Sequence, residues 1–332
     1  MQKIRVAING FGRIGRAAFR VASFRDDMEV VAINDLAPVD ALAHLLQYDT
    51  VYGRYVQTVS AEGSSIVVDG RSVPVLAEPD PSQLPWKEHN IDVVLECTGR
   101  FVKDDASRAH LTAGARRMVL SAPAKGGTVE TFLRSINDDK CNADAVSNAS
   151  CTTNCISPVV RVMHDVFGVK KAMMTTIHSY TADQSLQDTP HKDMRRARAA
   201  AANIVPTTTG AAIATTQVIP ELAGRFDGMA VRVPTIVVSL SDITFLLSRS
   251  VTVSEVNDAL VAAASEQRYR HILGVTDKPL VSSDFIGDSR SSIVDLGLTQ
   301  VVDGDLVKVV SWYDNEWGYA NRLVELAEIV SR

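Results

Sequence analysis

The stretch IRVAINGFGRIG (residues 4–15) decides the fold, because an apolar strand pattern runs directly into a GxGxxG turn. A helical pattern follows over residues 13–24. In such a turn Gly10 permits the tight bend, Gly12 lets the backbone approach a pyrophosphate, and Gly15 lets the helix lie close to the strand. The stretch therefore predicts the first strand, turn and helix of a Rossmann-type unit. The alternative is a glycine turn that only packs a helix on a strand.

A carboxylate follows the second strand pattern, residues 30–34. Asp35 lies 20 residues after Gly15, where an acidic side chain is expected to accept a hydrogen bond from the ribose 2′-OH of a dinucleotide. The next residues, Leu36-Ala37-Pro38, supply no arginine that could neutralise a 2′-phosphate. The sequence therefore predicts NAD, rather than NADP, as the cofactor.

The rest of the first half alternates short apolar strand patterns with helical ones, which predicts a doubly wound parallel sheet covered by helices. The expected elements are strands at residues 4–9, 30–34, 93–97 and 118–121, helices at 13–24 and 106–113, and a proline-rich loop at 78–85.

The second half has longer strand patterns and fewer helices, which predicts an α+β unit with a mixed or antiparallel sheet. Pro158 is expected to kink or restart a helix that begins near Cys151 and runs to Phe167. Residues 319–330 carry apolar side chains along one face, which predicts an amphipathic helix that must dock on another element. The remaining expected elements are strands at 172–177, 229–232, 236–245 and 306–312 and helices at 210–218 and 254–264.

Length and composition narrow the class of protein. A chain of 332 residues is expected to form two domains. Its 34 Lys and Arg against 39 Asp and Glu give a net charge of −5, so no nucleic-acid or membrane partner is expected. No apolar run approaches the ~20 residues of a membrane span. The four cysteines are too few for a disulfide framework, and no His pair stands near Cys151 and Cys155, so reduced thiols, no metal and a cytoplasmic location are expected.

The run SNASCTTNC (residues 147–155) places a cysteine at the expected start of a helix. The helix N-terminus favours the thiolate of Cys151 over the thiol, and the thiolate is the nucleophilic form. Ser150 can cap the helix, and Thr152 offers a further donor to an anion beside the sulfur. The alternative is a buried structural cysteine, but the polar flanks favour a reactive one.

The same run resembles the catalytic-cysteine motif of the phosphorylating glyceraldehyde-3-phosphate dehydrogenases, and the resemblance extends over essentially the whole chain. The other matching segments are NGFGRIGR (9–16), HSYTADQ (178–184), RRARAAA (195–201) and WYDNEWGY (312–319). The resemblance implies an NAD-binding domain at residues 1–150, onto which a C-terminal helix at 316–332 docks, and a catalytic domain at 151–315.

The resemblance also implies the reaction. Such an enzyme oxidises D-glyceraldehyde 3-phosphate to 1,3-bisphosphoglycerate in glycolysis or gluconeogenesis, through a cysteine hemithioacetal and thioester. Its partners are the small-molecule substrate and inorganic phosphate. A long polar loop at residues 179–202 packs across subunits in the family, which implies a homotetramer.

His178 is the expected base, because it ends an apolar strand pattern, opens a polar run and matches the family's catalytic histidine. An imidazolium at this position is expected to lower the pKa of the Cys151 thiol, and the neutral ring can take the hydroxyl proton as hydride leaves. The other six histidines are interpreted as packing or surface residues. Asn154 and Cys155 are expected to serve helix packing.

The resemblance assigns the binding residues by position. The cofactor-binding residues are Gly10, Phe11, Gly12, Arg13, Ile14, Gly15, Asp35, Thr98, Gly99, Ser121 and Asn315. The substrate phosphate is assigned to Thr181, Asp183, Arg196 and Arg232, and the attacking phosphate to Ser150, Thr152, Thr209 and Gly210. Without the resemblance, Thr98 and Ser121 could make only ordinary hydrogen bonds at strand ends, and Arg195, Arg196 and Arg198 could form a solvated basic face.

Three departures and three alternatives remain. Ser179 stands where the family commonly has alanine, Ile213 where many members have lysine, and Ser135-Ile136-Asn137 where Gly-Val-Asn is usual.

Erythrose-4-phosphate dehydrogenase shares the cysteine motif but tends to lose the phosphate-binding threonines, which this chain keeps. A semialdehyde dehydrogenase normally prefers NADPH, which conflicts with Asp35. A non-enzymatic dinucleotide- or RNA-binding protein conflicts with the cysteine and histidine pair and the acidic net charge.

Overall fold

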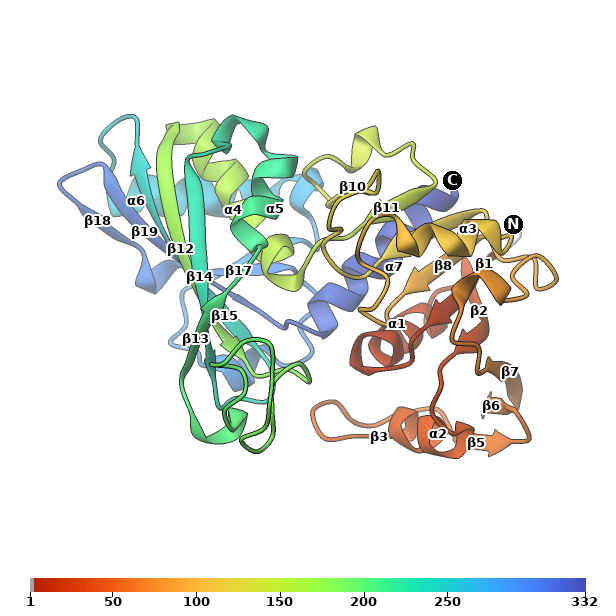
Figure 1. Cartoon of the computed structure of the whole chain (residues 1–332). Coiled ribbons are helices and arrows are strands. Elements are labelled where there is room, and N and C mark those ends of the chain that lie inside the picture. Colours follow the sequence, from red (N-terminus) through yellow and green to blue (C-terminus); the bar gives the residue numbers. More distant parts are fainter. Residues whose placement is uncertain (1–2) are drawn as a thin grey trace. The chain divides into compact units, whose positions relative to one another are not determined.

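The computed structural model describes residues 3–332, which form two compact units (Figure 1). The first unit runs to Ala149 and takes in Ala320–Arg332, and the second is Ser150–Tyr319. None of the helices in residues 3–332 combines the length and the apolar character needed to cross a membrane.

Nine strands form the sheet of the first unit: β1 (Ile4–Asn9), β2 (Met28–Asn34), β5 (Val59–Glu62), β6 (Ser65–Val68), β7 (Arg71–Leu76), β8 (Val93–Glu96), β9 (Arg117–Leu120), β10 (Glu130–Thr131) and β11 (Ala145–Ser147). Their order is β10-β11-β9-β8-β1-β2-β7-β6-β5. β1 pairs in parallel with both β2 and β8, so the strand order reverses there as in a doubly wound sheet. Only the hairpins β5–β6 and β6–β7 are antiparallel. A separate pair joins β3 (Tyr48–Asp49) and β4 (Gly53–Arg54).

Both faces of this sheet are covered, as its continuous apolar strands require. Val6 and Ile8 of β1 face one buried cluster, while Ala7 faces another that contains Trp86. The first cluster also buries Leu323 of α7 (Trp317–Ser331), which confirms the predicted amphipathic C-terminal helix. The other helices of the unit are α1 (Arg13–Ser23), α2 (Val39–Gln47) and the short α3 (Ala109–Thr112).

The second unit contains a mixed sheet with the strand order β13-β14-β12-β15-β19-β17-β16 and β18 beside β19. The strands are β12 (Val169–Ser179), β13 (Val205–Thr208), β14 (Phe226–Val233), β15 (Ser239–Leu247), β16 (Leu273–Thr276), β17 (Ser292–Asp295), β18 (Gln300–Val302) and β19 (Leu306–Tyr313). β12 pairs in parallel with β14 but antiparallel with β15. The predicted α/β class, a doubly wound sheet plus a mixed-sheet unit, is confirmed.

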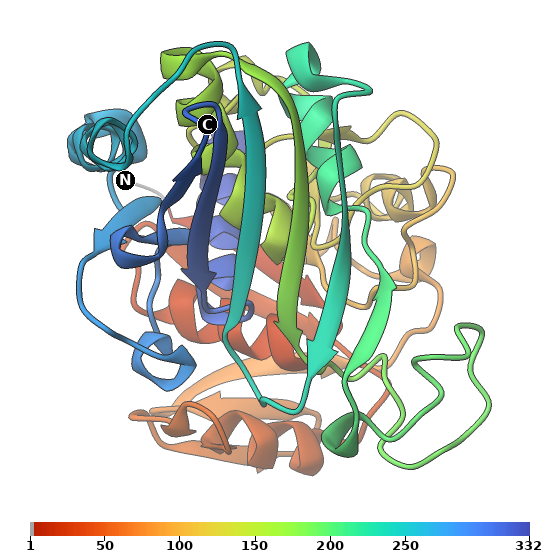
Figure 2. The same cartoon turned by 90° about the vertical axis from the view of Figure 1, so that its left-hand side faces the viewer.

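Helices cover one face of the second sheet. They are α4 (Cys151–Phe167), α5 (Ala211–Val218) and α6 (Val253–Ser265). α4 packs against β12, β15, β17 and β19, and α5 packs against β14. Figure 2 looks onto the opposite face of this sheet, with α4 behind the strands.

Four expected elements differ from the structure. The helix expected at 106–113 is divided into a 3-10 turn, Ala106–Arg108, and α3. The turn begins directly after Asp105, which has a left-handed φ of 62°. The loop at 78–85 holds one 3-10 turn, Pro81–Gln83, because Asp80 caps it. Residues 236–238 do not join β15, since Val238 has a φ of 69°. α4 continues through Pro158 rather than restarting, which the packing of its largely buried residues allows.

Candidate active site

A hollow of about 250 Å³ opens at the carboxyl ends of β1, β2 and β8, where doubly wound sheets bind ligands. Four chain segments line it, and they lie at or shortly after the ends of β1, β2, β7 and β8. Its lining residues are Asn9, Gly10, Gly12, Asn34, Asp35, Leu36, Glu78, Pro79, Cys97, Thr98, Arg100 and Phe101.

The three glycines of the turn have distinct surroundings. Gly10 has a φ of +90°, and a Cβ there would lie 2.7 Å from the amide nitrogen of Thr98. A Cβ on Gly15 would lie 2.1 Å from the carbonyl oxygen of Gly10, so the helix can approach the strand only with glycine. A Cβ on Gly12 would meet nothing within 4 Å. The turn therefore leaves open backbone at Gly12, on the side that lines the hollow, and this fits a dinucleotide pyrophosphate.

Asp35 is held at the rim of the hollow by backbone amides. Its carboxylate accepts hydrogen bonds from the amide of Phe11 at 2.7 Å and the amide of Ala37 at 2.9 Å. A carboxylate has about four acceptor positions, so others are left for a ribose hydroxyl. Its charge disfavours a 2′-phosphate at the same place, as the sequence predicts.

Other predicted cofactor residues take different positions. The Phe11 ring is buried and packs edge-on against Phe19. Arg13 pairs with Asp49 at 2.8 Å. Neither side chain lines the hollow, and the same holds for Ile14 and Ser121. Gly99, with a φ of 68°, shapes the turn after Thr98.

In the second unit, Cys151 is the first residue of α4. Ser150 precedes it in an extended conformation and its hydroxyl accepts a hydrogen bond from the amide of Thr153 at 3.1 Å. The predicted N-cap is confirmed. The thiol of Cys151 therefore lies at the positive end of a 17-residue helix.

Cys151 and His178 form a pair. The sulfur lies 3.5 Å from Nε2 of His178, which stands near the end of β12. Nδ1 of the ring lies 2.7 Å from the carbonyl oxygen of Ser179, which can only accept a hydrogen bond. Arg232 Nη1 also lies 3.2 Å from Nδ1, but its two protons are donated to the Ser179 carbonyl and the Thr181 hydroxyl. Nδ1 therefore carries the proton, and the Nε2 lone pair faces the thiol. Sequence reasoning did not identify the Ser179 carbonyl, which sets this tautomer.

The electrostatics correct one expectation. Burial, and then the charge of Arg232, lower the pKa of His178 to about 3, so the ring is neutral rather than an imidazolium. Burial raises the pKa of Cys151, and Arg232 and the hydrogen bonds from Thr152 oppose that rise. The cation that favours the thiolate is thus Arg232. The imidazolium expected to lower the Cys151 pKa does not form at His178, because the imidazole is buried beside a guanidinium.

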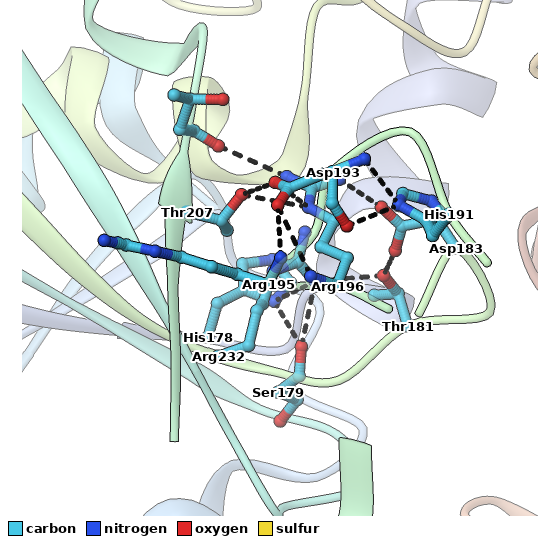
Figure 3. Close-up of polar contacts among 11 residues, drawn as sticks. His178, Ser179, Thr181, Asp183, His191, Asp193, Arg195, Arg196, Thr207 and Arg232 are labelled. Carbon is cyan, nitrogen blue, oxygen red and sulfur yellow. Dashed lines mark hydrogen bonds and ion pairs between the residues drawn. The ribbon is translucent and has the colours of Figure 1, made fainter. Parts of the chain in front are cut away.

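A cluster of arginine and aspartate side chains lies next to His178 (Figure 3). Arg232 Nη1 donates to the Ser179 carbonyl at 3.0 Å and to the Thr181 hydroxyl at 2.9 Å. Asp183 accepts hydrogen bonds from both Thr181 and Arg196. The Nε of Arg232 is buried and has no hydrogen-bond partner among residues 3–332. An unsatisfied buried guanidinium N–H suits an anionic ligand.

The residues assigned to the attacking phosphate lie in two different surroundings. The Thr152 hydroxyl is buried and lies 2.8 Å from the Tyr313 hydroxyl, which lies 2.9 Å from that of Thr176. The Thr209 hydroxyl accepts from the Ala211 amide at the start of α5, so its own proton remains available to a ligand. Gly210 is the N-cap of α5. Tyr313 was not predicted, although it stands in the WYDNEWGY segment.

Comparison with known proteins identifies the family. Residues 4–104 match the model "Glyceraldehyde 3-phosphate dehydrogenase, NAD binding domain" and residues 150–315 match "Glyceraldehyde 3-phosphate dehydrogenase, C-terminal domain". The chain belongs to the glyceraldehyde 3-phosphate dehydrogenase family.

Relatives within this family cover nearly the full chain. The chain is 52% identical over 331 residues to glyceraldehyde-3-phosphate dehydrogenase of Geobacillus stearothermophilus. This match covers 99% of this chain and 98% of the relative. It is 50% identical over 332 residues to glyceraldehyde-3-phosphate dehydrogenase 1 of Bacillus subtilis (strain 168), with 99% and 98% covered. It is 49% identical over 328 residues to the Zymomonas mobilis enzyme of that name, with 98% and 97% covered.

The structure also gives the surroundings of four further residues that the sequence analysis considers. Cys155 is fully buried, with its sulfur 3.6 Å from the Ser311 hydroxyl, and Asn154 donates to the Ser150 carbonyl at 3.0 Å. Asn315 is buried and accepts from Ser239 at 3.0 Å. Arg198 is exposed and pairs with Asp188, as a solvated basic face predicts.

Proposed function

We propose that this chain is an NAD-dependent phosphorylating dehydrogenase that converts D-glyceraldehyde 3-phosphate to 1,3-bisphosphoglycerate, as in glycolysis and its reversal. The observation that carries the proposal is the thiol of Cys151 at 3.5 Å from an unprotonated His178 Nε2, beside the cluster of Arg232, Thr181, Asp183 and Arg196. A nucleophile, a base and an anion site together suit an aldehyde that carries a phosphate. No observation favours erythrose 4-phosphate.

The protein groups have separate tasks in this proposal. The sulfur of Cys151 adds to the aldehyde carbon, and the thiol proton passes by way of His178 to the new hydroxyl oxygen. His178 Nε2 then takes the hydroxyl proton while the hydrogen on carbon leaves as hydride. The carbon–sulfur bond remains, now in a thioester. Arg232, Arg196 and Thr181 hold the substrate's phosphate during both steps.

Bound NAD supplies the hydride acceptor for this oxidation. In the proposal, residues 1–150 with the helix at 316–332 bind the dinucleotide, and residues 151–315 carry out catalysis. Open backbone at Gly12 suits the pyrophosphate, Asp35 suits a ribose hydroxyl, and the Asn315 amide suits the carboxamide of the nicotinamide.

Inorganic phosphate is the proposed acyl acceptor. Its oxygen attacks the acyl carbon, the carbon–sulfur bond breaks, and the thiolate of Cys151 leaves. Thr209 supports this step because its hydroxyl proton is not used by the Ala211 contact, and Gly210 adds the start of α5. Ser150 and Thr152 complete the proposed site next to the sulfur.

The deciding experiment follows NADH formation from glyceraldehyde 3-phosphate with and without inorganic phosphate. We expect phosphate-free enzyme to stop after about one equivalent of NADH per Cys151, because the thioester accumulates. Thr209→Ala is expected to raise KM for phosphate more than KM for the aldehyde. Undiminished turnover without phosphate would show that water is the acceptor and would refute the proposal.

The oligomeric state and the compartment are also proposed. A homotetramer is supported by apolar side chains that the second unit exposes on strands of its sheet, namely Met173, Met229 and Leu306, and on the long loop, Leu186 and Met194. A cytoplasmic location is supported by four cysteines that are all free. Sedimentation equilibrium of the purified chain tests the first of these proposals.

A further inference from the structure

A polar row crosses the sheet of the first unit at the floor of the hollow. Asn34, Asn9 and Glu96 are the last residues of β2, β1 and β8, and they are neighbours in register. All three are buried, and Glu96 is fully so. Such a row at the ends of apolar strands requires an internal hydrogen-bond network, because water cannot solvate it.

The direction of the hydrogen bond between His110 and Glu96 follows from Trp86. Its indole N–H can only donate, and it lies 3.0 Å from Nδ1 of His110. Nδ1 must therefore accept, so the His110 proton is on Nε2, which lies 2.9 Å from the Glu96 carboxylate. His110 is thus a neutral donor to Glu96, held in one tautomer, and it is not the cation of an ion pair.

Four donors converge on Glu96. Its Oε2 accepts from Nε2 of His110 and from Nδ2 of Asn9, the latter at 2.5 Å. Its Oε1 accepts from the amide of Thr98 at 2.8 Å and from the Thr98 hydroxyl at 2.5 Å. A carboxylate has about four acceptor positions, and a protonated carboxyl would have to donate to one of these groups. Glu96 is therefore ionised, and its charge is satisfied by neutral donors alone.

The network reaches each segment that lines the hollow. Asn9 precedes the glycine turn and accepts from Nδ2 of Asn34 at 2.7 Å. Asn34 holds Glu78 through two bonds of 2.9 Å, one to its carbonyl and one from its amide. The Thr98 hydroxyl in turn accepts from the Arg100 amide at 3.1 Å. One buried carboxylate thus connects four segments that are far apart in sequence.

We propose that Glu96 is the positioning residue of the dinucleotide hollow, and that its four hydrogen bonds hold the lining segments in the conformation that binds NAD. This inference rests on the proposed function only in taking NAD as the ligand of the hollow. Glu96 does not line the hollow, so it acts through Asn9 and Thr98.

A consequence concerns what Thr98 can offer. Its amide and its hydroxyl proton are both committed to Glu96. Toward the hollow, the Thr98 oxygen can therefore only accept a hydrogen bond, which suits a ribose hydroxyl or an amino group and does not suit a phosphate. Glu96 thus sets the polarity of this wall as well as its position.

The test compares Glu96→Gln with Glu88→Gln, which removes an exposed carboxylate of the same unit. A glutamine at 96 has an amide group that donates, so it must face at least one of the present donors. We expect calorimetric titration to show NAD affinity at least about tenfold weaker for Glu96→Gln and unchanged for Glu88→Gln. KM for NAD is expected to rise in step, with kcat at saturating NAD close to the parent value. Parent affinity in Glu96→Gln, or a fall in kcat without a change in KM for NAD, overturns the proposal.

A second pair keeps the carboxylate and changes only one donor. His110→Gln can still donate to Glu96 and accept from Trp86, whereas His110→Leu can do neither. We expect His110→Gln to bind NAD within about threefold of the parent and His110→Leu to bind several-fold more weakly. Equal affinities in the two variants overturn the proposal even if Glu96→Gln does not fold. A parent that binds NAD but does not oxidise glyceraldehyde 3-phosphate refutes the proposed function and leaves this titration decisive.

Discussion

Replacement by alanine is expected to have different effects at two glycines of the same turn: it lowers stability at Gly15 and weakens NAD binding at Gly12. At Gly15 the added Cβ would lie 2.1 Å from the carbonyl oxygen of Gly10 and 3.2 Å from the Ile8 side chain. Backbone must move by about 1 Å to relieve the first contact, and overpacking of this kind costs about 1–3 kcal/mol. The gain from alanine in a helix, about 0.5–1 kcal/mol, offsets only part of that cost.

Gly12→Ala meets no atom within 4 Å, and Gly12 has an ordinary φ of −72°. Alanine is a poorer N-cap than glycine by up to about 1 kcal/mol, but it restricts the unfolded chain by a similar amount, about 0.4–1 kcal/mol. The net change in unfolding free energy is therefore near zero. The methyl group nevertheless occupies the open backbone on which a pyrophosphate is expected to lie, so NAD affinity should fall at least about tenfold.

Thermal unfolding and calorimetric NAD titration measure the two effects separately. We expect Gly15→Ala to lower the unfolding temperature and Gly12→Ala to leave it nearly unchanged while it weakens NAD binding. A Gly12→Ala variant that binds NAD like the parent would refute the assignment of this backbone to the pyrophosphate. A Gly15→Ala variant with the parent's unfolding temperature would refute the close helix-to-strand contact.

The other predictions concern the chemistry. Cys151→Ser should abolish dehydrogenase activity and keep NAD binding, whereas Cys155→Ser should keep most activity; similar rates in the two variants would contradict the nucleophile assignment. His178→Asn should slow hydride transfer about 10²–10⁴-fold in single-turnover measurements, and an unchanged rate would exclude it as the base. Asp35→Gly should narrow the difference in kcat/KM between NAD and NADP, and a parent that prefers NADP would contradict the role of Asp35. Because the pKa of His178 is about 3 when folded and about 6.5 when unfolded, the unfolded chain binds the extra proton between these values. The parent should therefore lose stability as the pH falls from about 6.5 toward 3, and His178→Asn should lose less in urea unfolding at pH 7 and pH 5.

Much of the fold could be predicted because the sequence contains strong local patterns. The glycine turn after an apolar strand marks the doubly wound unit, and Ser150 marks the start of α4. The wrong bounds arose where packing outweighs local preference. Pro158 removes a helical hydrogen bond, yet α4 continues because its flanking residues are buried. Val238 takes a left-handed φ that β-branched residues avoid, and no local pattern indicates that.

The site was predicted less completely, because its electrostatics depend on contacts distant in sequence. Cys151 and His178 could be paired by motif, but the neutral state of the imidazole depends on its burial and then on Arg232, 54 residues away. Glu96 was missed, although an acidic residue at the end of the apolar pattern 93–97 is an unusual feature that could have been noticed. The ion pair of Arg13 with Asp49 depends on the β3–β4 pair, in which Asp49 lies. The glycine motif that contains Arg13 gives no indication of this partner.

Arg232 acts on both reacting groups, and the two actions serve different stages of the proposed reaction. Its charge favours the thiolate of Cys151 and disfavours a proton on His178. Before substrate binds, the first effect opposes the rise in the Cys151 pKa that burial causes, and the second makes the imidazole a weak base. A phosphate dianion bound to Arg232 offsets the guanidinium charge, and an anion near His178 raises the proton affinity of the ring. The imidazole therefore becomes a better base when the phosphate of the substrate is in place, which is the stage at which the hydroxyl proton has to be removed. A phosphorylated aldehyde thus contributes to catalysis through its charge as well as through its binding energy.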